Sequence, residues 1–182
     1  MYDAQRKETN KLIDIFVSSN ALATTEHSST ESLNRSELTN LPNALLKYIH
    51  GGRGIVTLEN SLNNKHHTYE FRRPNNPDEF PPEIMFVYTL VKDNTWMYVG
   101  MYDKQTQMFR LTRYSKFQKK SEIVRGVSFI LKKIKSIAND PNNVMKIYHE
   151  GVCAICGKKL TTPKSIQFGI GPKCRKVLET RL

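Results

Sequence analysis

The chain has 182 residues, of which 38% are hydrophobic and 25% charged, with a formal net charge of +11. A chain of this length can bury one ordinary core and carry a small additional module. It contains no apolar run of about 18 residues, and its first residues lack the apolar stretch of a signal peptide, so we expect neither a membrane span nor secretion. Three cysteines clustered near one end fit a reducing compartment and predict a cytoplasmic protein.

The positive charge lies in the second part of the chain. Residues 1–103 contain 10 Lys and Arg against 13 Asp and Glu, a balance of −3, whereas residues 104–182 contain 18 against 4, a balance of +14. A one-sided field of this sign attracts polyanions and speeds association with them. Nucleic acid is the commonest partner of this kind, and the alternatives are an acidic protein or a surface that only confers solubility.

The first forty residues divide into a short helix and a linker. Residues 4–17 place four apolar side chains along one side of a predicted helix, which is marginal in water without a partner. Residues 18–40 are rich in Ser, Thr, Asn and Glu, a composition typical of flexible linkers. We therefore expect residues 1–40 to lie outside the core domain, with the helix docked on that domain or on a partner.

Residues 41–148 follow with the pattern of a core domain. An apolar helix begins near Pro42 and ends at Gly51-Gly52. Alternating apolar and polar residues then predict a hairpin, and three further apolar segments separated by short polar turns predict an antiparallel meander. The predicted strands cover residues 54–60, 67–73, 84–91, 95–102 and 107–114.

A long amphipathic helix and one more strand complete this domain. Ser121 is typical of a helix N-cap, and the apolar face of the helix continues to Ala138. Residues 144–148 form a last predicted strand, which leads directly into His149. The pattern predicts an α+β fold in which an antiparallel sheet of about five or six strands, curved or partly closed, is packed by one main helix.

The last predicted domain, residues 149–182, contains all three cysteines. Cys153 and Cys156 form a CxxC pair followed by glycine, a turn that points both sulfurs at one position. A Gly-Ile-Gly-Pro run before Cys174 predicts a sharp turn and a helix that starts at the proline. His149 completes a closed Cys3His set, so the spacing predicts one structural zinc ion in a small knuckle of treble-clef type.

Other chemistry is possible for three cysteines. They could be buried thiols, a disulfide with one spare thiol, or a redox CxxC pair. A redox pair would need a helix running directly from it, and the residues after Gly157 lack helical periodicity, which favours zinc. Glu150, Glu179 or a histidine from elsewhere are alternative fourth ligands. A catalytic zinc would need an acid or base at an open position, for which Glu150 is the obvious candidate.

A long pattern of residues runs from His149 to Cys174: HEG-x-C-x2-C-G-x2-L-T-x-P-x-S-x3-G-I-G-P-x-C. In this pattern the C-terminal third of the chain resembles an uncharacterised family that is common in bacteriophage and bacterial genomes. A looser similarity continues upstream into residues 98–100 and 109–112. The resemblance implies a zinc-binding, phage-type cytoplasmic protein, and it implies no particular activity.

Basic side chains of the second half are candidate contacts for nucleic acid. Residues 109–120 interleave aromatic and positive side chains, which could stack on bases and neutralise phosphates, although the same aromatic residues could belong to the core. Further basic residues lie on the predicted long helix and around the cysteines. The candidate contacts are Arg110, Arg113, Lys116, Lys119, Lys120, Lys132, Lys133, Lys158, Lys159, Lys164, Lys173, Arg175 and Lys176.

The sequence shows no convincing catalytic constellation. Gly169-Ile170-Gly171 lacks the further glycine and the preceding strand of a dinucleotide site, and carboxylates are scarce in the basic half. We therefore predict a phage-type accessory protein that is not an enzyme and binds DNA or RNA through a zinc finger and a basic surface. The alternative is a protein-interaction module that inhibits or redirects a host protein, and a zinc hydrolase that uses Glu150 is a third, weaker hypothesis.

Overall fold

The structure is a computed structural model that describes residues 36–38, 42–76, 78–135 and 144–179. The helix predicted at residues 4–17 lies outside these ranges. The elements are, in chain order, β1 (Ser36–Glu37), α2 (Pro42–His50), β2 (Arg53–Asn60), β3 (His66–Arg72), β4 (Ile84–Leu90), the 3-10 turn η2 (Lys92–Asn94), β5 (Trp96–Asp103), β6 (Met108–Arg110), α3 (Glu122–Lys135), β7 (Met145–His149), α4 (Pro163–Phe168) and α5 (Pro172–Glu179).

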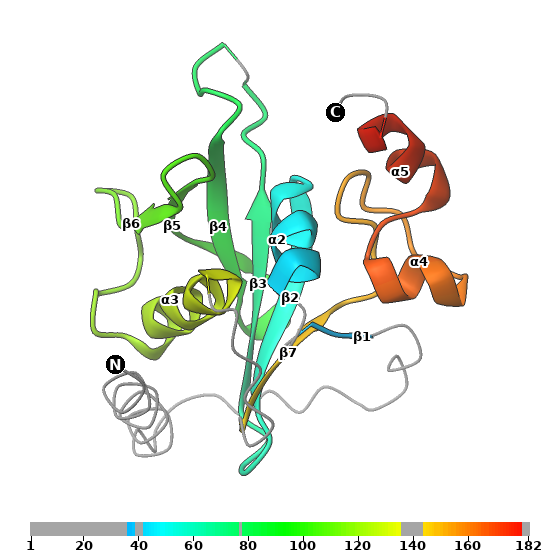
Figure 1. Cartoon of the computed structure of the whole chain (residues 1–182). Coiled ribbons are helices and arrows are strands. Elements are labelled where there is room, and N and C mark those ends of the chain that lie inside the picture. Colours follow the sequence, from blue (N-terminus) through cyan, green and yellow to red (C-terminus); the bar gives the residue numbers. More distant parts are fainter. Residues whose placement is uncertain (1–35, 39–41, 77, 136–143, 180–182) are drawn as a thin grey trace.

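The strands form one open sheet of seven strands in the order β1-β7-β2-β3-β4-β5-β6, and every pairing is antiparallel (Figure 1). The α+β class and the antiparallel sheet are as predicted. The sheet does not close into a barrel, since its two edge strands are β1 and β6. The meander β2 to β6 is built from consecutive strands, whereas β7 returns from the end of the chain to lie between β1 and β2.

Strand β1 comes from a segment whose composition predicts a linker. Ser36 and Glu37 pair with His149 and Tyr148 at the free edge of β7. The next residue, Leu38, is only 1% exposed, and its N–H donates to the Ile147 carbonyl. Backbone pairing, the buried Leu38 side chain and an ion pair between Glu37 and Lys146 at 3.3 Å thus hold this short segment on the sheet.

Helices α2 and α3 lie side by side on one face of the sheet (Figure 1). Residues alternate in direction along each strand, so the apolar residues at every second position, such as Tyr69 and Phe71 of β3, meet these helices. Gly126 of α3 permits the closest approach, because a Cβ there would overlap the Tyr69 side chain. The Tyr69 hydroxyl donates to the Ile123 carbonyl at 3.1 Å, which satisfies the one polar atom of a fully buried ring.

Two further elements, β6 and α4, differ from the prediction. Strand β6 ends at Arg110 rather than at residue 114, because residues 112–115 form a turn in which the Ser115 N–H donates to the Thr112 carbonyl and the Ser115 hydroxyl accepts from the Thr112 N–H. Helix α4 lies where the sequence predicts no helix. None of the described helices is long and apolar enough to cross a membrane.

Candidate metal centre

The three cysteines converge in the structure. Their sulfur atoms all lie within 4.8 Å of one another, and within the described residues no other histidine, cysteine or carboxylate joins the group. All three are free thiols; Cys153 is buried, Cys174 is half-buried and Cys156 is exposed. Three sulfur atoms at this spacing form a donor set that suits a soft or borderline metal ion such as zinc.

The CxxC turn owes its shape to glycine and to backbone hydrogen bonds. Gly157 has φ of 71°, in the left-handed region that glycine adopts without strain. Its N–H donates to the Cys153 carbonyl at 2.8 Å, and the Cys153 N–H donates to the Lys158 carbonyl at 2.8 Å. These bonds close a tight loop, so both sulfurs of the pair point to one side.

Cys174 reaches the pair from the first turn of α5. The helix begins at Pro172, as predicted, because a proline needs no N–H partner at this position. The preceding Gly171 lies beside the pair, with its N–H 3.5 Å from the Cys153 sulfur. The loop that follows α4 and the start of α5 therefore place the Cys174 sulfur and the Gly171 N–H beside the Cys153 sulfur.

The pKa values of Cys153 and Cys174 shift in opposite directions, because their surroundings differ. Burial raises the pKa of the Cys153 thiol, but N–H groups of Gly171, Cys156 and Ile155 outweigh it and hold that pKa below its ordinary value. Burial and the two neighbouring sulfurs raise the pKa of Cys174 to about 12. The neighbours thus oppose a third negative charge, and a bound divalent cation would remove that opposition.

The candidate metal centre packs directly against the core of the sheet domain. Ala154, Leu160 and Ile170 belong to the same buried cluster as Tyr48 of α2. The Ala154 carbonyl accepts from the N–H of Arg53, the first residue of β2, at 2.7 Å. The module comprising β7, the cysteine loop, α4 and α5 lies beside α2 and β2 (Figure 1).

His149 is fully buried and is not part of the cysteine group. Its Nδ1 accepts from the Gly151 N–H at 3.0 Å, so the proton of a neutral ring sits on Nε2, which donates to the Ile166 carbonyl. The ring also lies 5.2 Å from the Tyr48 ring, centroid to centroid. To bind the metal, the imidazole would have to give up one of these bonds, and its role as fourth ligand stays a prediction.

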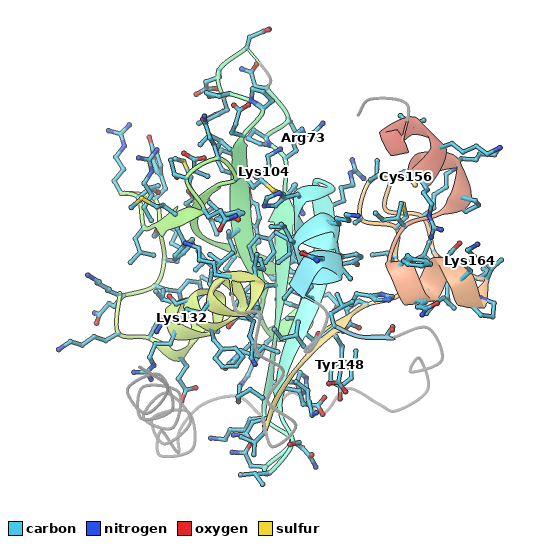
Figure 2. The ribbon with its side chains drawn as sticks, viewed as in Figure 1. Arg73, Lys104, Lys132, Tyr148, Cys156 and Lys164 are labelled. Carbon is cyan, nitrogen blue, oxygen red and sulfur yellow. The ribbon has the colours of Figure 1, made fainter. Side chains whose placement is uncertain are left out.

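The basic residues proposed from the sequence are spread across the molecule. Lys132 on α3 and Lys164 on α4 lie on opposite sides of the molecule (Figure 2). Near β6, Tyr114 is 63% exposed with the Arg113 guanidinium 4.7 Å from its ring, whereas Phe109 and Phe117 pack against the core. The candidates with exposed side chains are Arg110, Arg113, Lys116, Lys119, Lys120, Lys132, Lys158, Lys159, Lys164, Lys173 and Lys176, and those that are half-buried are Lys133 and Arg175.

One contact in the module is not predicted by the sequence pattern. Arg175 of α5 places its guanidinium 4.2 Å from the ring of Phe168, which is 44% exposed at the end of α4. The pair could not be foreseen, because α4 itself was not predicted. The signals for that helix were Pro163 at its first position and Gly169, with φ of 65°, at its end.

Comparison with known families finds a match over the metal module alone. No curated protein and no solved structure matches the chain significantly. The profile of a family of unknown function (DUF6011) matches residues 146–179, from β7 through α5, and so includes all three cysteines.

Proposed function

We propose that the chain is a zinc-binding, non-catalytic protein that holds nucleic acid against the basic surface of its metal module. The observation that carries this proposal is the convergence of three sulfurs inside a module whose outer surface is strongly basic. Residues 149–182 contain seven Lys and Arg against two Glu. A phage-type origin remains an expectation drawn from the resemblance.

The proposed metal role is structural. The site joins a loop, a turn and a helix start that share few backbone hydrogen bonds with one another, so a metal ion would fix their relative positions. Zinc suits a thiolate set, because it binds sulfur in a tetrahedral arrangement and needs no redox change. Cys153, Cys156 and Cys174 would hold the ion, with His149 proposed as the fourth ligand after a shift of its ring.

The proposed nucleic-acid surface surrounds this centre. Lys158 and Lys159 are exposed on the cysteine loop, and Lys173 and Lys176 are exposed on α5. Several lysines on a small rigid module neutralise phosphates without reading bases, so binding would show little sequence preference and a steep dependence on salt. The exposed Phe168 ring under Arg175 adds a flat surface to the same module.

Metal content and salt-dependent binding test this function. The purified chain should contain one zinc per molecule, and its affinity for a labelled oligonucleotide should fall steeply between about 50 and 200 mM salt. The double variant K173Q/K176Q should bind more weakly and lower the slope of log K against log salt by about 0.9 for every duplex phosphate that it no longer neutralises. A matched variant, K47Q/K92Q, removes two exposed lysines from the other half of the chain and should change neither quantity.

Two results would contradict the proposal. If the chain contains no metal and its cysteines react freely with a thiol reagent under native conditions, the zinc centre does not exist. Unchanged affinity and salt slope in K173Q/K176Q would show that the module is not the nucleic-acid surface.

A further inference from the structure

A row of aromatic rings runs across the face of the sheet that faces away from α2 and α3. Phe80 packs edge-on against Phe86 with ring centroids 4.9 Å apart, and Phe86 packs edge-on against Tyr98 at 5.8 Å. Tyr98 in turn meets Tyr88 at 5.6 Å, and the Arg72 guanidinium lies 4.7 Å from the Tyr88 ring. We call Phe86, Tyr88, Tyr98 and Arg72 the aromatic face.

Strand register places these side chains together. Tyr88 of β4 lies opposite Tyr98 of β5 and opposite Glu70 of β3, while Arg72 lies opposite Phe86. Their neighbours along β4, Val87 and Thr89, point to the helix side and are fully buried. A bulge in β5 pairs Val87 with Gly100 and Tyr88 with Tyr98, which keeps the rings aligned on one face.

Within the described residues, no helix lies over the aromatic face. Its rings are half-buried, with Phe80 against Phe86 and the Thr112 hydroxyl 3.4 Å from the Tyr98 hydroxyl, whereas Tyr69 and Tyr102 on the helix side are completely buried. Several aromatic rings gathered on one face of the sheet form an apolar patch. Patches of this kind on a protein surface mark binding sites.

The charges around the rings favour an anionic partner. Arg110 lies opposite Met101, which places it on the same face, and it is near enough to Tyr98 to oppose the rise that burial causes in the pKa of that hydroxyl. The backbone N–H of Lys116, whose side chain is exposed, donates to the Tyr98 carbonyl. Of the nearby acids, Glu70 is ion-paired with Arg72, and Asp103 accepts backbone N–H groups of its own turn.

We propose that the aromatic face binds single-stranded nucleic acid, with unpaired bases stacked on the rings of Tyr88 and Tyr98 and with phosphates neutralised by Arg110 and Lys116. Stacking requires base faces that a duplex conceals, so the site would prefer single strands. The inference rests on the proposed function for its class of partner, and adds a second surface and the single-stranded form. An acidic protein could use the same charges but would not depend on the rings.

Two matched double variants test the role of the rings. Y88L/Y98L removes both rings but keeps apolar side chains against the sheet, and Y88F/Y98F keeps both rings and removes only the hydroxyls. Binding of the full-length chain to a fluorescein-labelled 20-nucleotide single strand and to the duplex of the same sequence is followed by fluorescence anisotropy. We expect Y88L/Y98L to weaken single-strand binding by about tenfold or more and duplex binding by less than about threefold, and Y88F/Y98F to match the unaltered chain.

The position of the bound strand is read independently on the unaltered protein. Trp96 is the chain's single tryptophan; it lies opposite Leu90 on the same face, so a strand bound there should quench its emission. Photocrosslinking to a single strand containing 5-iodouracil, followed by mass spectrometry, should label Tyr88, Tyr98 or Phe86. Because these readouts need no variant, they decide the question even if Y88L/Y98L fails to fold by circular dichroism.

The failures of the two proposals are distinguishable. Equal single-strand affinity in both tyrosine variants, with crosslinks confined to residues 158–176, would overturn this inference and leave the metal module as the nucleic-acid surface. Equal affinity for single strand and duplex would also overturn it. If no oligonucleotide binds at any salt concentration, both proposals are wrong, and an acidic protein becomes the expected partner.

Discussion

Gly169 lies where α4 ends and the chain turns toward Cys174. Its φ of 65° is left-handed, and a Cβ at this position would overlap the Tyr48 ring. Its carbonyl also accepts from the Ala154 N–H at 3.0 Å, which links α4 to the cysteine loop. The absence of a side chain therefore lets the metal module lie directly on α2.

Replacing Gly169 by alanine should destabilise the protein strongly. Backbone strain and overpacking each cost about 1–3 kcal/mol, so we expect the free energy of unfolding to fall by about 2–5 kcal/mol in denaturant titration. Gly171→Ala is the matched control, since its φ is not left-handed and its Cβ would meet only the Leu160 side chain at 3.8 Å. Equal stability of the two variants would show that Tyr48 does not press on Gly169.

At the scale of elements, β1 is a strand of two residues that owes its place to its neighbour Leu38. A pair of strands this short has almost no stability of its own, so side-chain contacts must hold it in place, chiefly the burial of Leu38 together with the ion pair between Glu37 and Lys146. The strand also covers the edge of β7, whose N–H and C=O groups would otherwise face water.

Leu38→Ala should release β1 from the sheet. Truncation of a fully buried leucine costs about 2–5 kcal/mol, and the same change at Leu62, which is 70% exposed, should cost less than about 0.5 kcal/mol. Hydrogen exchange adds a local reading: the amide of residue 38, which donates to the Ile147 carbonyl, should lose its protection. Retained protection in Leu38→Ala would mean that backbone pairing alone holds the strand.

The elements that the sequence predicts are those in which many residues carry the same structural signal. The alternation along β3, the continuous apolar run of β4 and the apolar face of α3 each repeat one signal over seven or more residues. The sequence likewise predicts that the three cysteines converge, because CxxC-Gly and Gly-Pro before Cys174 specify local turns. Helix α4 and strand β1 are too short for periodicity to appear, and both depend on contacts with distant parts of the chain. The surroundings of His149 depend in the same way on Ile166, which only the folded chain brings near.

Across the whole molecule, one buried cluster extends from the sheet into the metal module. Cys153, Leu160 and Ile170 belong to it together with residues of α2, α3 and five strands of the sheet. The two parts cannot separate without exposing this shared apolar surface. The division of the chain at residue 148, predicted from its sequence, therefore does not imply two independent folding units.

Removal of the proposed metal ion should consequently lower the stability of the whole chain. We expect a strong chelator, or the Cys174→Ser variant, to shift a single cooperative transition to lower temperature in scanning calorimetry. Ser128→Ala is a suitable control, because it removes a hydroxyl from α3, distant in sequence from the cysteines. If the module instead melts in a separate early transition and the sheet keeps its original Tm, the shared cluster does not couple them.

The place of β7 between β1 and β2 also bears on how the protein is made. Of the described strands, β7 is synthesised last, and it leads directly into the cysteine loop. Until it arrives, the nascent chain presents the edge of β2 as an open template, and β1 has nothing to pair with. Closing that edge of β2 and delivering the first two sulfurs therefore depend on the same addition to the nascent chain, so covering the strand edge and completing the candidate metal site are coupled steps.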